Sequence, residues 1–261
     1  MKIRIFASGS SGNCLVLSDA DTNILIDAGI SLRRITDSLA GVGLTMNDIR
    51  GVLITHEHSD HISGLPMLVK RFGVKIYAPG ELCEVLAACK SELSTSLNYI
   101  RANEAFCLEG LNITPFRTPH DSHFSFGYRV EGDAVFAFAT DTGCVTEDML
   151  AGLNGAEAVV IEANHDVDML RSGPYPFYLK RRILSDFGHL SNFECGKLAL
   201  HLANSGTRHI ILGHLSRENN TPELAYCAVK SALADSEAEL FVAPMDKMLE
   251  INIGETVKCS E

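Results

Sequence analysis

The stretch Thr55-His56-Glu57-His58-Ser59-Asp60-His61 follows the apolar run Gly51-Val52-Leu53-Ile54 and places four potential metal ligands within six positions. Such an apolar run predicts a buried strand, so the histidine-rich stretch is expected at a strand's carboxyl end, where α/β enzymes place their sites. Because side chains alternate in an extended segment, His56 and His58 are expected to point the same way and to bind one ion. Asp60 and His61 lie where the chain turns into the next helix and can bind a second ion. Imidazole and carboxylate together suit zinc, manganese or iron.

The pattern His-x-His-x-Asp-His after a hydrophobic strand resembles the metallo-β-lactamase-fold hydrolases. The resemblance implies an α+β fold, a four-layer αββα sandwich, with two metal ions between its sheets. It also implies further ligands downstream, each at the end of a predicted strand. The sequence shows no repeat, low-complexity tract or linker, so we expect one domain over residues 1–261.

Composition indicates a globular cytosolic protein. The chain has 261 residues, of which 46% are hydrophobic and 21% charged. No apolar run approaches the roughly 20 residues that cross a bilayer, and the amino terminus lacks the apolar region of a signal peptide. The eight cysteines are scattered without a CxxC pair, which favours reduced, buried thiols. We therefore expect a cytoplasmic protein without a membrane partner.

The net charge of −11 argues against an extended nucleic-acid-binding surface, although not against a local one. Bound divalent cations would offset part of this charge. The basic run Lys180-Arg181-Arg182 is either such a local contact or a solvated helix face, and the sequence supports both interpretations equally.

Apolar periodicity and turn residues predict the order of the remaining elements. Strands are expected at 3–6, 15–17, 24–26, 74–77, 113–116, 124–130, 134–139, 156–161 and 209–212, with two more near the carboxyl terminus. Helices are expected from Ser31 to 39, at 62–72 and 81–89, from Ser191 or Asn192 to about 204, and from Thr221 to 233. The stretch around 171–180 has too few regular signals to place.

Polar residues follow the later strands where the resemblance implies ligands. His120 follows strand 113–116, Asp141 follows strand 134–139 and His214 follows strand 209–212. A carboxylate suits a bridging position because its two oxygens can each bind one ion. The resemblance thus implies that one ion is bound by His56, His58 and His120, that the other is bound by Asp60, His61 and His214, and that Asp141 bridges them.

Two further residues stand near the implied ligands. Asp27 ends a predicted strand in Asp27-Ala28-Gly29, and the resemblance implies that it supports the metal-binding loop; from the residues alone it is an ordinary turn. His123 lies close to His120 in the chain. It either lines the pocket or is a partly exposed histidine without a role.

Two divalent ions generate a hydroxide at neutral pH and stabilise a developing oxyanion, so the implied chemistry is hydrolysis with a metal-bound hydroxide as the nucleophile. His189, in Gly-His-Leu-Ser, resembles the extra histidine of phosphodiesterase branches. There it donates a proton to the leaving oxygen or binds the phosphate. His189 and Asp60 are therefore the candidate catalytic residues, Asp60 also as a ligand.

Three segments resemble the YycJ/WalJ group of small bacterial metallo-β-lactamase-fold proteins: Ser8–Asn13, Gly188–Asn192 and Gly213–Ser216. The group is associated with exonuclease activity on DNA and with DNA repair. The resemblance implies a metal-dependent phosphodiesterase acting on nucleic acid, in particular a 5′-to-3′ DNA exonuclease. Phosphates are then expected at the first loop and at exposed polar residues, each equally well an ordinary surface residue: Ser11, Asn13, Arg171, Tyr175 and Arg217.

Other interpretations use the same ligands. Hydrolysis of a small phosphodiester, thioester or lactone is supported by the same two ions. A non-catalytic regulatory protein could keep the ions for structure alone. His189 favours the phosphodiesterase, because a structural metal site has no need of a proton donor.

Overall fold

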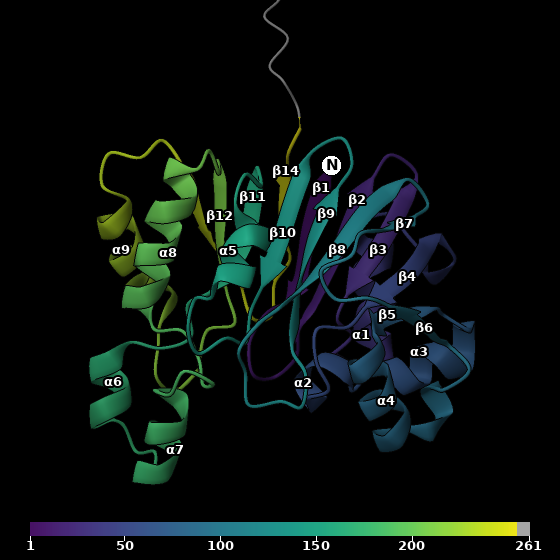
Figure 1. Ribbon diagram of the computed structural model, residues 1–261, viewed down its shortest axis with the longest axis horizontal. Coiled ribbons are helices and arrows are strands. Elements are labelled where there is room, and N and C mark those ends of the chain that lie inside the picture. Colours follow the sequence, from purple (N-terminus) through teal and green to yellow (C-terminus); the bar gives the residue numbers. More distant parts are fainter. Residues whose placement is uncertain (255–261) are drawn as a thin grey trace, which may run out of the picture.

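The computed structural model describes residues 1–254. Within this range, two seven-stranded sheets face each other, and helices cover the outer face of each (Figure 1). The layers follow the order α, β, β, α, so the predicted four-layer sandwich is confirmed. A single domain over 1–261 stays a prediction, and residues 255–261 lie outside the described range.

The first sheet is built mainly from the amino-terminal part of the chain. In spatial order its strands are β14 (Leu249–Asn252), β1 (Lys2–Ala7), β2 (Cys14–Asp19), β3 (Thr22–Ile26), β4 (Ile49–Leu53), β5 (Ile76–Pro79) and β6 (Leu97–Ile100). Strands β3 to β6 are parallel, and β14, β1, β2 and β3 pair antiparallel. Its outer face is covered by α1 (Leu32–Gly41), α3 (Leu65–Phe72) and α4 (Gly80–Cys89). Two 3₁₀ turns join these elements, η1 (Met46–Asp48) and η2 (Ser91–Leu93).

The second sheet is built from the rest of the chain. In spatial order its strands are β13 (Glu239–Val242), β12 (His209–Gly213), β11 (Ala158–Glu162), β10 (Val135–Ala139), β9 (Phe126–Glu131), β8 (Leu111–Arg117) and β7 (Phe106–Leu108). Strands β10 to β13 are parallel, and β7 to β10 pair antiparallel. Its outer face is covered by α5 (Glu147–Leu153), α8 (Asn192–Asn204) and α9 (Pro222–Leu233).

Both faces of each sheet are buried, which explains the near-continuous apolar runs of the strands. In β2, Leu15 and Leu17 contact the core between the sheets, whereas Val16 between them contacts the core under the helices. Side-chain alternation along the strand produces this division.

Strand directions bring the candidate residues to one end of the sandwich. In the first sheet β3 and β4 are parallel, so the loops after Ile26 and Leu53 leave at the same edge. In the second sheet β10, β11 and β12 are parallel, and β8 runs in their direction because β9 is antiparallel to both β8 and β10. The edges of the two sheets meet where His61 Nε2 lies 3.3 Å from Asp141 Oδ2.

The predicted helix over 62–72 is confirmed from Leu65 to Phe72, but its predicted start is wrong. The chain forms a short helix, α2 (Ser59–Ile62), and starts again as α3 at Leu65. Between them, the Gly64 amide donates to the Ala28 carbonyl at 2.8 Å, and a Cβ on Gly64 would lie 2.2 Å from the Ile30 carbonyl oxygen. Pro66 then occupies the first turn of α3, where its missing N–H is not needed. The strand expected at 74–77 likewise runs later, over β5.

The predicted caps of three helices are confirmed. Ser31 accepts from the Arg34 amide, Ser191 from the Glu194 amide and Thr221 from the Leu224 amide. The stretch that lacked regular signals forms two short helices, α6 (Val167–Ser172) and α7 (Phe177–Ile183). Among the described helices, none is long and apolar enough to cross a bilayer.

The cysteines are free thiols throughout the described range. Cys14, Cys83 and Cys195 are buried as expected, but the expectation of burial is wrong for Cys89, Cys107 and Cys227, which are exposed. Cys259 lies outside the described residues.

Candidate active site

The seven predicted ligands gather in one cluster at the strand ends. Their donor atoms form three groups in which every atom lies within 4.8 Å of the others: His56, His58 and His120; Asp60, His61 and His214; and His56, His61 and Asp141. The first two groups match the two predicted sets. Asp141 touches the second set as well, because its Oδ1 lies 3.2 Å from His214 Nδ1.

Hydrogen bonds hold the histidine rings by one nitrogen. The Nδ1–H of His61 donates to Asp27 Oδ2 at 2.7 Å, and the Nδ1–H of His120 donates to the Gly188 carbonyl at 3.1 Å. Since carboxylate and carbonyl oxygens only accept, these bonds fix the proton on Nδ1 and leave Nε2 as a lone pair facing the cluster. Such outer partners commonly orient metal-binding histidines.

Asp27 therefore occupies the supporting position that the resemblance implied. Its carboxylate also accepts from the Thr55 amide at 2.9 Å and from the Thr55 hydroxyl. The Thr55 hydroxyl in turn lies 3.0 Å from His56 Nδ1. One carboxylate thus orients His61 directly and His56 through Thr55.

Several buried donor atoms of the cluster lack a hydrogen-bond partner among the described residues: Nε2 of His56, His120 and His214, and Oδ2 of Asp141. Unpaired buried polar atoms are rare in native proteins and indicate a bound group. Nitrogen and carboxylate oxygen together are ligands for a borderline divalent cation. The residues present therefore fit bound metal ions.

The charge of the cluster supports the same conclusion. Four carboxylates that belong to it or touch it form no ion pair with a described Lys or Arg, those of Asp27, Asp60, Asp141 and Glu162; a fifth, that of Asp121 beside His120, is paired with Arg182. Burial raises the pKa of Asp60, but the neighbouring His214 and His61 rings, each with Nε2 3.5 Å from Asp60 Oδ2, more than offset this and hold the pKa well below its ordinary value. Buried charges need compensation, and two divalent cations would balance four formal negative charges.

Three site residues have left-handed backbone conformations. The φ angles of Asp27, Asp141 and His214 are 60°, 56° and 54°. This conformation is uncommon for residues other than glycine, and at functional sites the surrounding structure commonly enforces it. The His214 amide, for example, donates to the hydroxyl of Ser8 at 2.8 Å. Each turn bends the chain sharply after a strand and directs the side chain into the cluster.

Glu162 is a site residue that we missed from the sequence. It is fully buried at the end of β11, and its Oε1 accepts from Nδ1–H of His189 at 2.7 Å and of His214 at 2.8 Å. Its Oε2 accepts from the amides of Thr142 and Leu190 at 2.9 and 3.2 Å. Glu162 also forms a donor group with Asp141, His189 and His214, but because both its oxygens already accept hydrogen bonds, we infer that it orients these residues rather than serving as a ligand. Glu162 is the last residue of β11, and β11 lies in the sheet between the strands that precede Asp141 and His214. This position was the signal that could have identified Glu162.

Replacing Glu162 with glutamine tests this role. The amide keeps the shape but loses the charge and one acceptor, so metal affinity or activity is expected to fall roughly 10–100-fold. Metal content and turnover measure the effect. Glu104→Gln, at a side chain that is 62% exposed in a surface ion pair, is the matched control. Unchanged values in Glu162→Gln would show that the carboxylate does not position the site.

His189 lies at the rim of the cluster. Its ring centroid is 5.1 Å from that of His120 and 5.3 Å from that of His214, and its side chain is 20% exposed. Burial alone would lower the pKa of His189, but the charge of Glu162 and the hydrogen bond that His189 donates to Glu162 raise the pKa above its ordinary value. With Nδ1–H held by Glu162, Nε2 is the nitrogen that can present a proton to a substrate.

Asn13 is the one substrate candidate that reaches the ligands directly. Its Nδ2 lies 3.0 Å from His61 Nε2 and 3.4 Å from Asp60 Oδ2. Gly29 makes this approach possible, since a Cβ there would lie 1.6 Å from the Asp60 carbonyl oxygen. Ser11 lies further out and accepts from Arg217 at 3.0 Å, and Arg217 also pairs with Asp246 at 3.5 Å.

The other three candidates lie away from the ligand groups. The His123 side chain is 73% exposed, and its Nδ1 lies 2.8 Å from Glu57 Oε1. Arg171 lies in the last turn of α6 and Tyr175 lies between α6 and α7; Arg171 is exposed and Tyr175 half-buried. Their proposed contacts with substrate remain predictions.

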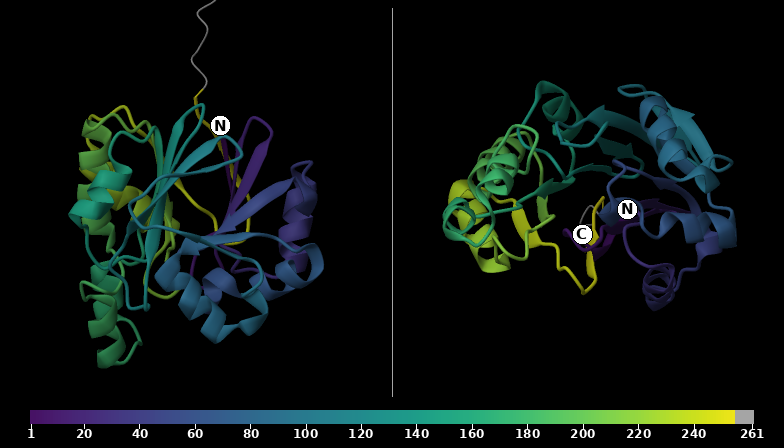
Figure 2. Two further views of the ribbon diagram at one scale, coloured as in Figure 1. Left: turned by 45° about the vertical axis from the view of Figure 1, so that its right-hand side comes forward. Right: turned by 90° about the horizontal axis from the view of Figure 1, so that it is seen from below.

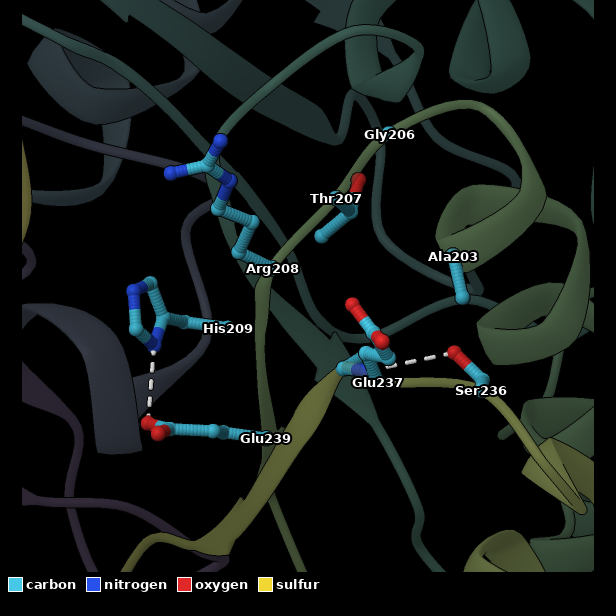
Figure 3. A pocket seen from close by; sticks show the side chains of 9 residues that line it. Ala203, Gly206, Thr207, Arg208, His209, Ser236, Glu237 and Glu239 are labelled. Carbon is cyan, nitrogen blue, oxygen red and sulfur yellow. Dashed lines mark hydrogen bonds and ion pairs between the residues drawn. The ribbon is translucent and has the colours of Figure 1, made fainter.

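The pocket in Figure 3 lies at the opposite end of the second sheet. It is lined by Arg208 and His209 at the start of β12, whereas His214 follows the end of that strand. His209 Nδ1 pairs there with Glu239 at 3.2 Å. This pocket is therefore separate from the candidate active site.

His165 is a buried histidine near Glu162 and His189 of the candidate active site, and its protonation affects the stability of the protein. Both ring nitrogens lack a hydrogen-bond partner among the described residues, and burial lowers the pKa of His165 to about 4. Between about pH 6.5, the ordinary pKa of histidine, and about pH 4, His165 is protonated in the unfolded chain and neutral in the folded chain. The free energy of unfolding is therefore expected to fall as the pH drops through this range.

The expected loss attributable to His165 is roughly 2 kcal/mol at about pH 5. Urea unfolding of the wild type and of His165→Gln at about pH 7.5 and pH 5, both in a metal chelator, measures it. The variant is expected to lose less stability on acidification. Equal losses in the two proteins would contradict the assignment.

Comparison with known proteins decides the family. A family model described as Beta-lactamase superfamily domain matches residues 22–215, the segment that carries all seven clustered ligands. The chain belongs to this superfamily. It is a metal-dependent hydrolase of the metallo-β-lactamase fold, and its His/Asp cluster lies where the strands of both sheets end.

Members of the superfamily resemble the chain along nearly its whole length. Exodeoxyribonuclease WalJ of Streptococcus pneumoniae serotype 2 is 38% identical over 240 residues, covering 90% of this chain and 89% of the relative. Exodeoxyribonuclease YycJ of Bacillus anthracis is 35% identical over 233 residues, covering 88% of each. The metallo-β-lactamase fold protein YhfI of Bacillus subtilis has a TM-score of 0.72 at 16% identity, covering 95% of this chain and 98% of that chain.

Proposed function

We propose that the protein is a dinuclear metal-dependent phosphodiesterase that acts on nucleic acid, namely a 5′-to-3′ exonuclease on DNA. Two relatives that cover nearly all of the chain carry the name exodeoxyribonuclease. The observation that carries the proposal is His189, which Glu162 holds at 2.7 Å beside the ligand groups.

The ligands form two sets, one for each metal ion. His56, His58 and His120 would hold one ion, and Asp60, His61 and His214 the other, with Asp141 shared between them. When bound, two such ions supply Lewis acidity and lower the pKa of water to near neutrality. Asp27 and Glu162 keep the imidazoles in the tautomer that binds metal, with the proton on Nδ1.

The residues around the ions then act on the phosphodiester. When the bond between phosphorus and the 3′ oxygen of the terminal nucleotide breaks, that oxygen needs a proton. His189 Nε2 is placed to give it, and the charge of Glu162 stabilises the protonated ring until it does. The loop Ser8–Asn13 and Arg217, whose side chain is 50% exposed, would contact the adjacent phosphate.

An end-specific nuclease assay tests the proposal. Linear duplex DNA, single-stranded DNA, RNA and closed circular DNA are incubated with manganese or zinc, beside a chromogenic phosphodiester, a thioester and a lactone. We expect stepwise shortening of linear DNA from the 5′ end and no cleavage of the closed circle. Turnover of the thioester or lactone alone, with metals bound, would contradict the proposal.

A further inference from the structure

An arm formed by residues 167–187, which contains α6, α7 and their flanking turns, projects from the sandwich. In Figures 1 and 2 the two helices extend beyond the second sheet on the side where the strand-end loops gather. Three aromatic side chains of the arm are largely exposed: Phe177 by 75%, Tyr178 by 74% and Phe187 by 61%. Exposed aromatic groups gathered on one element indicate a binding surface.

The arm is basic although the protein is acidic. It holds four Lys or Arg residues and two Asp residues, whereas the whole chain has a net charge of −11. Lys180 is engaged within the arm, because its Nζ donates to the carbonyls of Arg171 and Gly173 at 2.7 Å. Arg181 forms no ion pair with any described residue, and its guanidinium lies 6.0 Å from the centroid of the Phe177 ring. A free cation thus lies beside an exposed aromatic ring.

The arm is fixed to the rim of the candidate active site. Arg182 pairs with Asp121, and Asp121 Oδ1 lies 3.3 Å from His120 Nε2. Four residues after Arg182, near the carboxyl end of the arm, Asp186 packs against Gly143, where a Cβ would lie 2.3 Å from the Asp186 carbonyl carbon. Gly143 follows Asp141 by two residues. A polymer lying along the arm would therefore be led to the loops that carry His120 and Asp141.

We propose that the arm is the docking surface for a single-stranded nucleic acid whose end enters the candidate active site. Bases stack on Phe177, Tyr178 and Phe187, and Arg181 contacts the backbone phosphates. Aromatic platforms with interspersed cations are how proteins bind single strands without sequence preference, since every base has a π face. A duplex would not offer those faces. This inference rests on the proposed function, because the arm would deliver the nucleic-acid strand that the proposed exonuclease hydrolyses.

Binding to the intact protein tests the inference without cleavage. A fluorescent single strand of about 20 nucleotides is titrated with the wild type and with Phe177→Ala/Tyr178→Ala in a metal chelator, and anisotropy is recorded. Because two stacking rings are removed, the Kd of the double variant is expected to rise roughly 30-fold or more. Tyr99→Ala, at a side chain 64% exposed on β6, is the matched control and is expected to bind as the wild type does.

The phosphate contact has a separate readout. Arg181→Ala is expected to reduce the slope of log K against log salt concentration by about 0.7, the value for one phosphate of a single strand. Because the substituted side chains are exposed, unfolding midpoints are expected to stay close to that of the wild type.

Several outcomes would overturn the inference. One is a double variant that binds the strand as tightly as the wild type, and another is a wild type that does not bind it. A third is a wild-type dimer, in sedimentation, that the double variant dissociates without a change in strand affinity; the arm would then be an interface between copies. A strand that binds through the arm but is never hydrolysed would support the arm and contradict the proposed function instead.

Discussion

The Asp141→Ala variant is expected to lose both bound metal and activity, with turnover falling on the order of 10³-fold or more. Asp141 is buried at the centre of the cluster, with Oδ1 3.2 Å from His214 Nδ1 and Oδ2 3.3 Å from His61 Nε2. Because Asp141 also groups with His56 of the other ligand set, we propose that its carboxylate would be shared between the two ions. Metal content of the purified variant and its rate on linear DNA measure the two effects.

Asp141→Asn separates the loss of charge from a loss of folding. Asparagine tolerates the left-handed backbone that Asp141 adopts at φ 56°, whereas alanine does not adopt it readily. The asparagine variant is expected to keep the unfolding midpoint of the metal-free wild type and still to lose metal. Two ions per chain and an unchanged rate in Asp141→Asn would refute the bridging role.

His189→Ala is expected to keep its metal and to lose roughly 10²–10⁴-fold in rate on DNA. His189 hydrogen-bonds to Glu162 and forms a fourth donor group with Asp141, Glu162 and His214, but it belongs to none of the three groups that contain the seven predicted ligands. His201→Ala, an exposed histidine on α8 whose Nε2 lies 3.0 Å from Asn154 Oδ1, is the control. If His189→Ala turned over DNA at the wild-type rate, the catalytic role would be wrong.

The choice of leaving group distinguishes the two roles of His189. A nitrophenolate leaves without a proton, whereas the alkoxide of DNA needs one. If His189 donates that proton, the loss in His189→Ala is large on DNA and small on a nitrophenyl phosphodiester. Equal losses on both substrates would assign His189 to phosphate binding instead.

The sequence predicted most of this site because the end of a strand can be recognised from the residues next to it in the chain. Apolar runs mark β4, β8, β10 and β12, and the polar residues that follow them include His56, His120, Asp141 and His214. The contacts that orient the ligands were harder to predict from the sequence. Glu162 depends on His189 and His214, which are 27 and 52 residues away in the chain, and no local pattern encodes such pairs. The seven-residue match to a known family compensated for this in the ligands but not in Glu162.

Two failures of local prediction have tertiary causes. The break between α2 and α3 comes from contacts of Gly64 with Ala28 and Ile30, which the helical periodicity of the segment did not show. The arm at 167–187 carries short helices with exposed aromatic residues, so it lacks the apolar periodicity that indicates a helix packed on a core. In both segments the missing information was what the chain packs against.

Titration of the metal-free protein with manganese tests whether two bound ions are needed for activity. Activity on 5′-labelled linear DNA is followed as the ion is added to a known concentration of chain. Activity is expected to be absent without metal, to rise with added ion and to reach a plateau at two equivalents per chain, and Asp141→Asn is expected to show no such plateau. Full activity in a strong chelator, or saturation at a single equivalent, would contradict the need for two ions.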